Sequence, residues 1–271
     1  MSLIVFTDLD GTFLNQDDYK YDAAIPMVEK LKKRKIPVIP VTSKTRQEVE
    51  TLRTALDLQD PFIVENGSGA FVPIDNDRFA LPETEAKDYY LELFGCDYPR
   101  ARDGLKKVAE ILGEDLRGFA DLRDEEIQEL TGLSLEEVKL AKAREFTEPF
   151  LTPGNIAPEK LKEVVASLGF RVVVGDRFSH LISKDAGKGK AAKWLEKQYL
   201  LKSSANRVVT VGLGNSPNDL DLLEVVDYPI IIPGKKGPHS GLAGRGWEVA
   251  SAPGSEGWAI AMAKIYSQFI V

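Results

Sequence analysis

The first ten residues constrain the fold of this chain more than any other stretch. Leu3 to Phe6 are four consecutive apolar residues, and such a run predicts a strand buried on both faces of a parallel sheet. Asp8 and Asp10 follow it, and Gly11 indicates that the backbone turns there. We therefore expect both carboxylates at the carboxyl end of a central strand, the edge at which open α/β sheets bind ligands. The alternative is a turn without any function.

Strand and helix patterns alternate over the first 82 residues. Apolar, β-branched runs predict strands, and apolar residues at helical spacing predict helices. The expected strands are 3–6, 36–41 and 62–64, and the expected helices are 23–35 and 45–56, the second with Ser43 as its N-cap. The same patterns return later, with strands at 208–211 and 228–232 and helices at 187–200 and 258–269. This alternation is typical of a doubly wound parallel sheet.

Between these two stretches the pattern changes and helices dominate. Helices are expected at 83–94, 101–112, 124–130, 134–144 and 157–168, and strands at 170–174 and 178–182. We therefore predict an α/β fold with a doubly wound, Rossmann-like core of residues 1–82 and 185–271, interrupted by an inserted α+β module of residues 83–184. Because both connections of such a module leave one edge of the sheet, it can move over that edge as a lid.

The composition excludes several classes of function. A net charge of −7 argues against a nucleic-acid or anionic-membrane surface, because both require a basic face. No apolar stretch approaches the length of a membrane span, and the single cysteine, Cys96, cannot form an internal disulfide. We therefore expect a cytoplasmic protein without nucleic-acid or membrane partners. His180 and His239 cannot alone build a zinc site, so the chemistry is expected to use carboxylates, lysine and a metal such as Mg²⁺.

Three further polar clusters fall at the ends of expected core strands or at the starts of helices. Thr42, Ser43 and Lys44 follow the second strand, Lys188 opens a helix, and residues 212–219 follow a later strand. Together with the aspartate pair, these clusters stand in the order of the four motifs of the haloacid dehalogenase (HAD) superfamily of phosphotransferases, which the chain resembles. The position of the insert is similar to that of a C2-type cap in this superfamily.

The resemblance implies phosphoryl transfer, which depends on positioning and on neutralisation of charge. It implies that Asp8 is the nucleophile that forms an aspartyl-phosphate, and that Asp10 protonates the leaving oxygen and then deprotonates water. The expected phosphate ligands are Gly11, Thr42, Ser43, Lys188 and Asn218, with Thr42 and Lys188 also catalytic. Mg²⁺ prefers six hard oxygen ligands, and the expected ones are Asp8, the carbonyl of Asp10, Asn215, Asp219 and water.

One position departs from the superfamily pattern. Where the family has Gly-Asp-Ser-x-Asn-Asp, this chain has Asn215 in place of the first aspartate. An asparagine offers Mg²⁺ a carbonyl oxygen without a charge, so the metal affinity should fall unless Asp219 compensates. The asparagine is natural, marks a weakened enzyme, or is an inactivating substitution, and the sequence leaves all three open.

Within the superfamily, the chain resembles the mannosyl-3-phosphoglycerate phosphatase family. The matching segments are 41–45, 64–67, 175–181 and 212–223. The resemblance implies a small phosphorylated substrate, mannosyl- or glucosyl-3-phosphoglycerate, and hydrolysis to a glycosylglycerate such as mannosylglycerate, a compatible solute. Arg177 suits the glycerate carboxylate and His180 the sugar hydroxyls. The other expected substrate contacts are Lys44, Glu65, Asn66 and Gly67 at the mouth of the core site.

Three alternatives use the same residues differently. A phosphatase of this fold can act on sucrose phosphate, a hexose phosphate or pyridoxal phosphate, because residues of the insert decide the specificity. A non-catalytic binding protein would explain Asn215, but it has no need for both Asp8 and Asp10. Glycosyltransferases also hold a metal with Asp-x-Asp, but a nucleotide-binding half normally precedes that motif, so we do not expect one here. The oligomeric state stays open.

Overall fold

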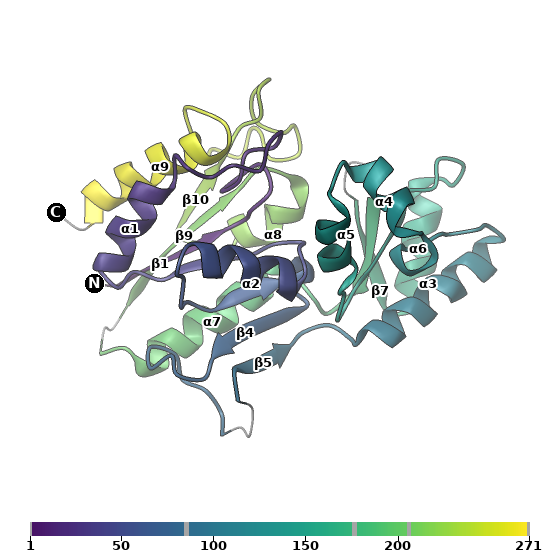
Figure 1. The fold of residues 1–271 in the computed structure, drawn as a ribbon, viewed down its shortest axis with the longest axis horizontal. Helices are drawn as coiled ribbons and strands as arrows, with labels where there is room; N and C mark the ends of the chain where they lie inside the picture. The colour runs from purple at the N-terminus through teal and green to yellow at the C-terminus, as the bar shows by residue number, and fades with distance from the viewer. Residues whose placement is uncertain (1, 84–86, 175–177, 205–206, 270–271) are drawn as a thin grey trace.

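The structure, a computed structural model, describes residues 2–83, 87–174, 178–204 and 207–269. Its central feature is a five-stranded parallel sheet with the strand order β11-β10-β9-β1-β2 (Figure 1). The strands are β1 (Ser2–Thr7), β2 (Val38–Pro40), β9 (Val208–Gly214), β10 (Tyr228–Ile231) and β11 (Glu248–Val249). β1 pairs in parallel with both β9 and β2, and its residues Ile4 and Val5 are fully buried. The apolar run at the N-terminus therefore forms an interior strand that is paired on both sides, as the sequence predicts.

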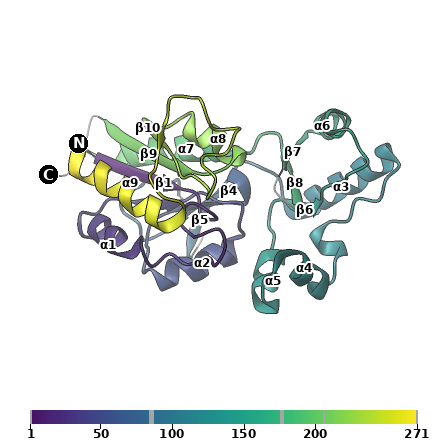
Figure 2. The same ribbon diagram turned by 90° about the horizontal axis from the view of Figure 1, so that it is seen from above.

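Helices cover both faces of this sheet (Figure 2). On one face lie α1 (Ile25–Lys33), α2 (Arg46–Ala55) and α9 (Gly254–Phe269), and on the other lie α7 (Lys188–Lys202) and α8 (Leu220–Leu223). Alternate side chains of β1 divide between the faces: Val5 belongs to the same buried cluster as Trp258 of α9, whereas Phe6 belongs to that of Leu195 of α7. The predicted doubly wound α/β core is confirmed.

A second, antiparallel sheet extends the first. It consists of β3 (Phe62–Val64), β4 (Gly69–Pro73) and β5 (Tyr89–Leu93), and a parallel bridge between Val41 and Ile63 connects it to the end of β2. The expected helix at 83–94 is wrong, because β5 pairs along its whole length with β4. Two adjacent tyrosines favour a strand, and the free edge of β4 offers them a partner, which outweighs the helical spacing of the apolar residues.

Two local features differ from the sequence predictions. Thr45, not Ser43, is the N-cap of α2: the Thr45 hydroxyl accepts the backbone N–H of Glu48, whose carboxylate accepts the N–H of Thr45. The strands β4 and β11 were not predicted at all. Within the described ranges, no helix combines the length and the apolar character that crossing a bilayer requires.

The segment after β5 forms a separate module, which we call the cap. Its antiparallel sheet, in the order β6-β8-β7, contains β6 (Glu148–Leu151), β7 (Phe170–Val174) and β8 (Phe178–Ser183). Its helical elements are α3 (Tyr98–Leu112), η2 (Phe119–Asp121), α4 (Asp124–Thr131), α5 (Leu135–Lys142) and α6 (Pro158–Ser167). α3 and α6 pack together with the sheet, whereas the hairpin of α4 and α5, which we call the cap arm, lies beside α2 of the core (Figure 1).

The division of the chain at residues 83 and 184 stays a prediction. Because β5 pairs with β4 of the core, the first change from core to cap falls after Leu93 rather than at residue 83. The cap arm is a further connection in space, since it reaches the core from the middle of the cap sequence. The cap is therefore in contact with the core at more places than its two chain connections.

Candidate active site

Polar side chains gather where the parallel strands of the core end. Asp8 follows β1, Ser43 lies just beyond β2, and the loop 215–219 follows β9. Together with β7 and β8 of the cap, these ends enclose a space of about 160 Å³, which we call the active-site cavity. Its lining residues are Asp8, Asp10, Gln16, Ser43, Asn66, Val173, Val174, His180, Asn215, Ser216 and Asn218.

A buried lysine connects two aspartates beside this cavity. Lys188 Nζ lies 2.7 Å from Asp8 Oδ1 and 2.6 Å from Asp219 Oδ1, and Lys188 has no exposed surface. Burial alone would lower the pKa of Lys188, but the charges of Asp219 and Asp8 outweigh burial and raise it. Lys188 therefore stays an ammonium ion and balances one of the two negative charges.

The second negative charge affects Asp8. Burial and the carboxylate of Asp219 raise the pKa of Asp8 to about 7, although Lys188 acts in the opposite direction. Two carboxylates that share one ammonium group leave an excess negative charge at a largely buried position. Any cation placed next to Asp8 would relieve this charge and favour the ionised form.

Asp219 is fully engaged within the protein. Its Oδ1 contacts Lys188, and its Oδ2 accepts the backbone N–H groups of Asn215 at 2.9 Å and Ser216 at 3.1 Å. Asp219 therefore shapes the loop and holds Lys188. Its predicted role as a direct metal ligand stays a prediction. In the part of the chain that the structure describes, no three His, Cys, Asp or Glu side chains are arranged to hold a metal. Of the predicted metal ligands, Asp8, Asp10 and Asn215 line the cavity.

Asp10 forms an ion pair with Lys44. Lys44 Nζ lies 3.1 Å from Asp10 Oδ1 and 3.4 Å from Glu48 Oε1. Burial alone would lower the pKa of Lys44, but these two carboxylates raise it. Lys44 does not line the active-site cavity, and its nearest charged partner is Asp10. Its predicted contact with a substrate stays a prediction.

Of Thr42 and Ser43, the two polar residues that follow β2, only Ser43 lines the active-site cavity. Thr42 has no exposed surface, and its hydroxyl oxygen accepts the backbone N–H of Lys44 at 3.2 Å. Its N–H and carbonyl groups bond to Ile63 and Asn66 of the neighbouring segment. Ser43 lines the cavity, whereas Thr42 lies behind it. The predicted contact of Thr42 with phosphate therefore stays a prediction.

Glu65 forms hydrogen bonds with the cap. It is fully buried, and its carboxylate accepts the backbone N–H groups of Glu145 at 2.8 Å, Phe146 at 3.3 Å and Thr147 at 2.8 Å. The hydroxyl of Thr147 donates to it as well, at 2.6 Å. These four bonds engage both carboxylate oxygens within the protein, and the predicted contact of Glu65 with a substrate stays a prediction. Glu65 anchors residues 145–147 of the cap to the core.

The next two residues continue this tight turn. Glu65, Asn66 and Gly67 all have left-handed backbone conformations, with φ of 48°, 58° and 84°. A Cβ atom on Gly67 would lie 2.1 Å from the carbonyl carbon of Gly187 and 2.4 Å from the backbone nitrogen of Lys188. Gly67 therefore supports the start of α7 and the position of Lys188, and the geometry gives it no contact with a substrate.

Asn66 keeps a hydrogen-bond donor available at the cavity. Its Oδ1 accepts Nδ2 of Asn218 at 3.3 Å, while its own buried Nδ2 has no partner among the described residues. Asn218 in turn accepts the Ser216 hydroxyl. Gly11, with φ of 76°, approaches the other side of the same loop, where a Cβ would lie 2.3 Å from Nδ2 of Asn215. These contacts place Gly11 and Asn218, two of the predicted phosphate-binding residues, beside the loop 215–219.

Comparisons with known proteins agree with this arrangement. Residues 5–86 match the model of the haloacid dehalogenase-like hydrolase family. The glucosyl-3-phosphoglycerate/mannosyl-3-phosphoglycerate phosphatase of Persephonella marina is 39% identical over 94% of this chain and 94% of its own. The mannosyl-3-phosphoglycerate phosphatase of Pyrococcus furiosus is 34% identical over 86% of this chain and 91% of its own. The chain belongs to the haloacid dehalogenase-like phosphatases.

A solved structure shares the whole fold of this chain. The sucrose-phosphatase of Synechocystis, crystallised with sucrose and phosphate, superimposes with a TM-score of 0.62. The comparison covers 100% of both chains at 16% sequence identity. At this identity the likeness concerns the fold alone.

On the cap side of the phosphatase cavity lies His180. Burial, together with the positive charges of Arg144 and Lys188, lowers the pKa of His180 to about 3, so the ring is neutral near pH 7. Its Nδ1 has no partner among the described residues. The predicted contact of Arg177 with a substrate falls outside the described residues.

Four residues of the cavity were not among the predicted site residues, and one of them, Ser216, lies within the expected motif 212–219. Gln16 lies in the loop after the aspartate motif, where the sequence shows no pattern. Val173 and Val174 lie in a strand that was predicted, but apolar residues in a strand carry no signal of a binding site. Their positions follow from the way the cap sits over the core, which the sequence does not reveal.

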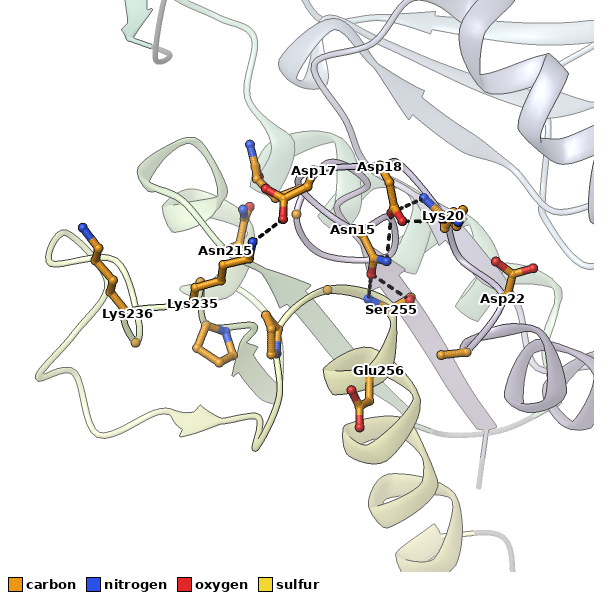
Figure 3. A pocket seen from close by; sticks show the side chains of 18 residues that line it. Asn15, Asp17, Asp18, Lys20, Asp22, Asn215, Lys235, Lys236, Ser255 and Glu256 are labelled. Carbon is orange, nitrogen blue, oxygen red and sulfur yellow. Dashed lines mark hydrogen bonds and ion pairs between the residues drawn. The ribbon is translucent and has the colours of Figure 1, made fainter.

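A larger cavity of about 1200 Å³ lies beyond Asn215 and Gln16, which border both spaces. Figure 3 shows its walls, formed by the loops after β1 and β10 and by the start of α9. Asp17 pairs with Lys235 across it at 2.5 Å, and Asn15 accepts the N–H and hydroxyl of Ser255. Its walls include neither Asp8 nor Lys188. The larger of the two cavities is therefore not the one that contains the proposed nucleophile.

Proposed function

We propose that this phosphatase hydrolyses mannosyl-3-phosphoglycerate or glucosyl-3-phosphoglycerate to the glycosylglycerate, with Mg²⁺ and in the cytoplasm. The observation that carries the proposal is the buried contact of Asp8 with Lys188, 2.7 Å long, beside a cavity that the cap covers. The substrates named for the two relatives supply its specificity. The only cysteine, Cys96, is buried and free, which agrees with a reducing compartment.

In the first step, a carboxylate oxygen of Asp8 attacks phosphorus and the bond from phosphorus to the glycerate oxygen breaks. Asp10 enters this step as the carboxylic acid, gives its proton to that oxygen as it leaves and becomes the carboxylate. In the second step, Asp10 takes a proton from a water molecule whose oxygen attacks the aspartyl-phosphate. The bond from phosphorus to Asp8 then breaks, and inorganic phosphate is released.

Lys188 and Ser43 are the groups best placed to hold the phosphate. Lys188 uses two of its three N–H groups for Asp8 and Asp219, which leaves the third for a phosphate oxygen. Lys188 lies beside the active-site cavity in contact with Asp8, and Ser43 and Asn218, which line that cavity, offer further donors. Because Lys188 is buried and fixed by two ion pairs, it requires little reorganisation when the charged group arrives.

The site fits Mg²⁺ on its own chemistry. Asp8, Asp10 and Asn215 bring hard oxygen atoms to one cavity, and the excess negative charge that raises the pKa of Asp8 favours a cation there. When bound, Mg²⁺ would neutralise negative charge on the phosphate and orient it. Asn215 contributes a neutral oxygen, so we propose weaker metal binding than an aspartate at this position would give.

The cap side of the cavity fits a glycosyl group. Val173 and Val174 offer apolar contacts, and neutral His180 and Asn66 offer hydrogen bonds without a net charge. Sugar hydroxyls suit such a mixed surface, since they both donate and accept. The predicted partner of the glycerate carboxylate is Arg177, because a guanidinium group binds a carboxylate through two parallel hydrogen bonds.

A phosphate-release panel with Mg²⁺ tests the proposal. We expect the highest kcat/KM on the two glycosyl-3-phosphoglycerates, lower values on hexose phosphates, sucrose phosphate and pyridoxal phosphate, and none for the Asp8→Asn variant on any substrate. A higher kcat/KM on one of the other phosphates would overturn the substrate assignment. If the parent protein releases phosphate from no substrate but the Asn215→Asp variant releases it from a glycosyl-3-phosphoglycerate, the parent is an impaired enzyme. If neither protein releases phosphate, the protein is a binding protein.

A further inference from the structure

Lys44 carries a charge that the mechanism above does not use. Its side chain is 17% exposed, and its ammonium group lies between Asp10 Oδ1 at 3.1 Å and Glu48 Oε1 at 3.4 Å. The ring of Tyr19 lies 5.4 Å from the same nitrogen. Lys44 therefore contacts the residue that transfers the protons, without lining the cavity in which phosphorus reacts.

Lys44 faces a separate space of about 150 Å³ between the core and the cap arm. Its walls include Tyr19, Lys44 and Glu48 of the core together with Leu133, Glu137 and Leu140 of the cap. A substrate whose phosphate contacts Asp8 occupies the active-site cavity instead. This placement favours a role for Lys44 that acts through Asp10.

The backbone on both sides of Lys44 is tied to the cap. The carbonyl of Ser43 accepts Nη1 of Arg144 at 2.7 Å, and the hydroxyl of Thr45 donates to the carbonyl of Leu140 at 2.8 Å. The carbonyl of Lys44 itself accepts the N–H of Glu65 at 3.0 Å. Lys44 is thus held by the core and by the docked cap at the same time.

We propose that Lys44 is a positioning residue that holds the carboxyl group of Asp10 in place for its proton transfers. Lys44 keeps its own three protons, and its contact with Oδ1 leaves Oδ2 of Asp10 to exchange the proton with the leaving oxygen and with water. The proposal rests on the proposed phosphatase function, in which Asp10 is the acid and base. It assigns no contact between Lys44 and the substrate.

The test compares leaving groups, because a positioned acid matters when the leaving oxygen is basic and little when it is not. The variants are Lys44→Met, Lys44→Arg and, as a matched control, Lys264→Met, whose surface ammonium pairs with Glu248 at 2.8 Å. The substrates are p-nitrophenyl phosphate, glycerol 1-phosphate and 3-phosphoglycerate. We measure kcat/KM, which reports the steps up to release of the leaving group.

For Lys44→Met we expect a loss of about 10- to 100-fold on both alkyl phosphates and of less than about threefold on p-nitrophenyl phosphate. Lys44→Arg should recover most of the loss, and Lys264→Met should change nothing. In the Asp10→Asn background, Lys44→Met should add no further loss on the alkyl phosphates, because the group that it positions is gone.

Other outcomes overturn the proposal. A loss confined to 3-phosphoglycerate would mean that Lys44 binds the substrate carboxylate. An equal loss on all three substrates, with a lower melting temperature, would mean a purely structural role. If the wild-type enzyme hydrolyses no alkyl phosphate, the same comparison is made with aryl phosphates of increasing leaving-group pKa. The test of Lys44 is therefore independent of whether the natural substrate carries a glycosyl group.

Discussion

At the scale of single residues, burial and the charge of Asp219 oppose the ionisation of Asp8. Its pKa is about 7 in the folded protein and near 3.8 in an unfolded chain. Between these values the folded state binds a proton that the unfolded chain does not, so the free energy of unfolding falls as the pH rises from about 4 to about 7. Catalysis requires the ionised form, which the metal-free fold disfavours.

Replacing Asp8 by asparagine should therefore stabilise the metal-free protein at high pH. We expect Asp8→Asn to unfold at a higher urea concentration than the parent at pH 8, by roughly 1 to 4 kcal/mol, and with little difference at pH 4. The pair is compared in urea with a chelator present at both pH values. The lowered pKa of His180 makes the free energy of unfolding rise with pH, which is the opposite trend. This contribution cancels in the comparison because both proteins contain His180. A stability difference independent of pH would contradict the prediction.

Asn215 gives the second prediction at this scale. Asn215→Asp adds a charge at the wall of the active-site cavity, so the Mg²⁺ concentration for half-maximal activity should fall about tenfold or more. Mg²⁺ should also raise the melting temperature more in this variant than in the parent, which reports binding without turnover. Asn76→Asp, in the turn after β4, adds the same charge as a control. No shift at Asn215 would mean that its side chain does not contact the metal.

The residue types of the site could be predicted, but not always where each side chain points. Asp8, Asp10 and Asn215 end at one cavity because they follow neighbouring parallel strands, a relation that the sequence order contains. Glu65 and Asn66 are adjacent in the sequence, yet one faces the cap backbone and the other faces the cavity. Their left-handed backbone conformations set these directions, and the segment of the cap that meets Glu65 lies about 80 residues later.

At the scale of elements, the junction between η1 (Glu65–Gly67) and α7 controls the position of Lys188. Gly67→Ala brings a methyl group against the backbone of Gly187 and Lys188, and the left-handed φ adds strain. We expect a loss of about 2 to 4 kcal/mol in unfolding free energy and of about 10- to 100-fold in kcat.

Gly132→Ala is the matched control, because Gly132 also has a left-handed φ, of 80°, but a Cβ there meets nothing within 4 Å. This variant should lose only about 1 kcal/mol and keep its activity. Equal effects of the two substitutions on kcat would show that contact with α7 is irrelevant to catalysis.

The elements that the sequence misses are those whose form depends on a distant partner. β5 becomes a strand because the edge of β4 lies beside it, and β11 has only two residues that pair with β10. By contrast, β1 and α2 form from local signals: a run of buried apolar residues in one case and a capping box in the other. Local signals thus define β1 and α2, whereas pairing with another strand defines β5 and β11.

At the scale of the whole molecule, the cap and the core are coupled through residues that the sequence does not distinguish from surface charges. Arg144 donates to Ser43 of the core at 2.7 Å and to Ala141 of the cap arm at 2.9 Å, and its charge lies 5.8 Å from the ring of Phe119. The carboxylate of Glu65 accepts hydrogen bonds from residues 145–147, which follow Arg144 in the sequence. The docked cap therefore forms hydrogen bonds with both the segment that contains Lys44 and the turn that supports Lys188.

Arg144→Gln tests this coupling. Removing the guanidinium group should cost about 1 to 2 kcal/mol in unfolding free energy, because the Ser43 carbonyl loses a charged donor. Amide exchange of residues 140–147 should accelerate, and kcat/KM on 3-phosphoglycerate should fall about tenfold, with a smaller loss on p-nitrophenyl phosphate. Arg245→Gln, which removes a surface ion pair to Glu224 and a ring contact to Trp247, is the matched control. If Arg144→Gln accelerates amide exchange in the cap but leaves both kcat/KM values unchanged, then cap docking is independent of the groups that react.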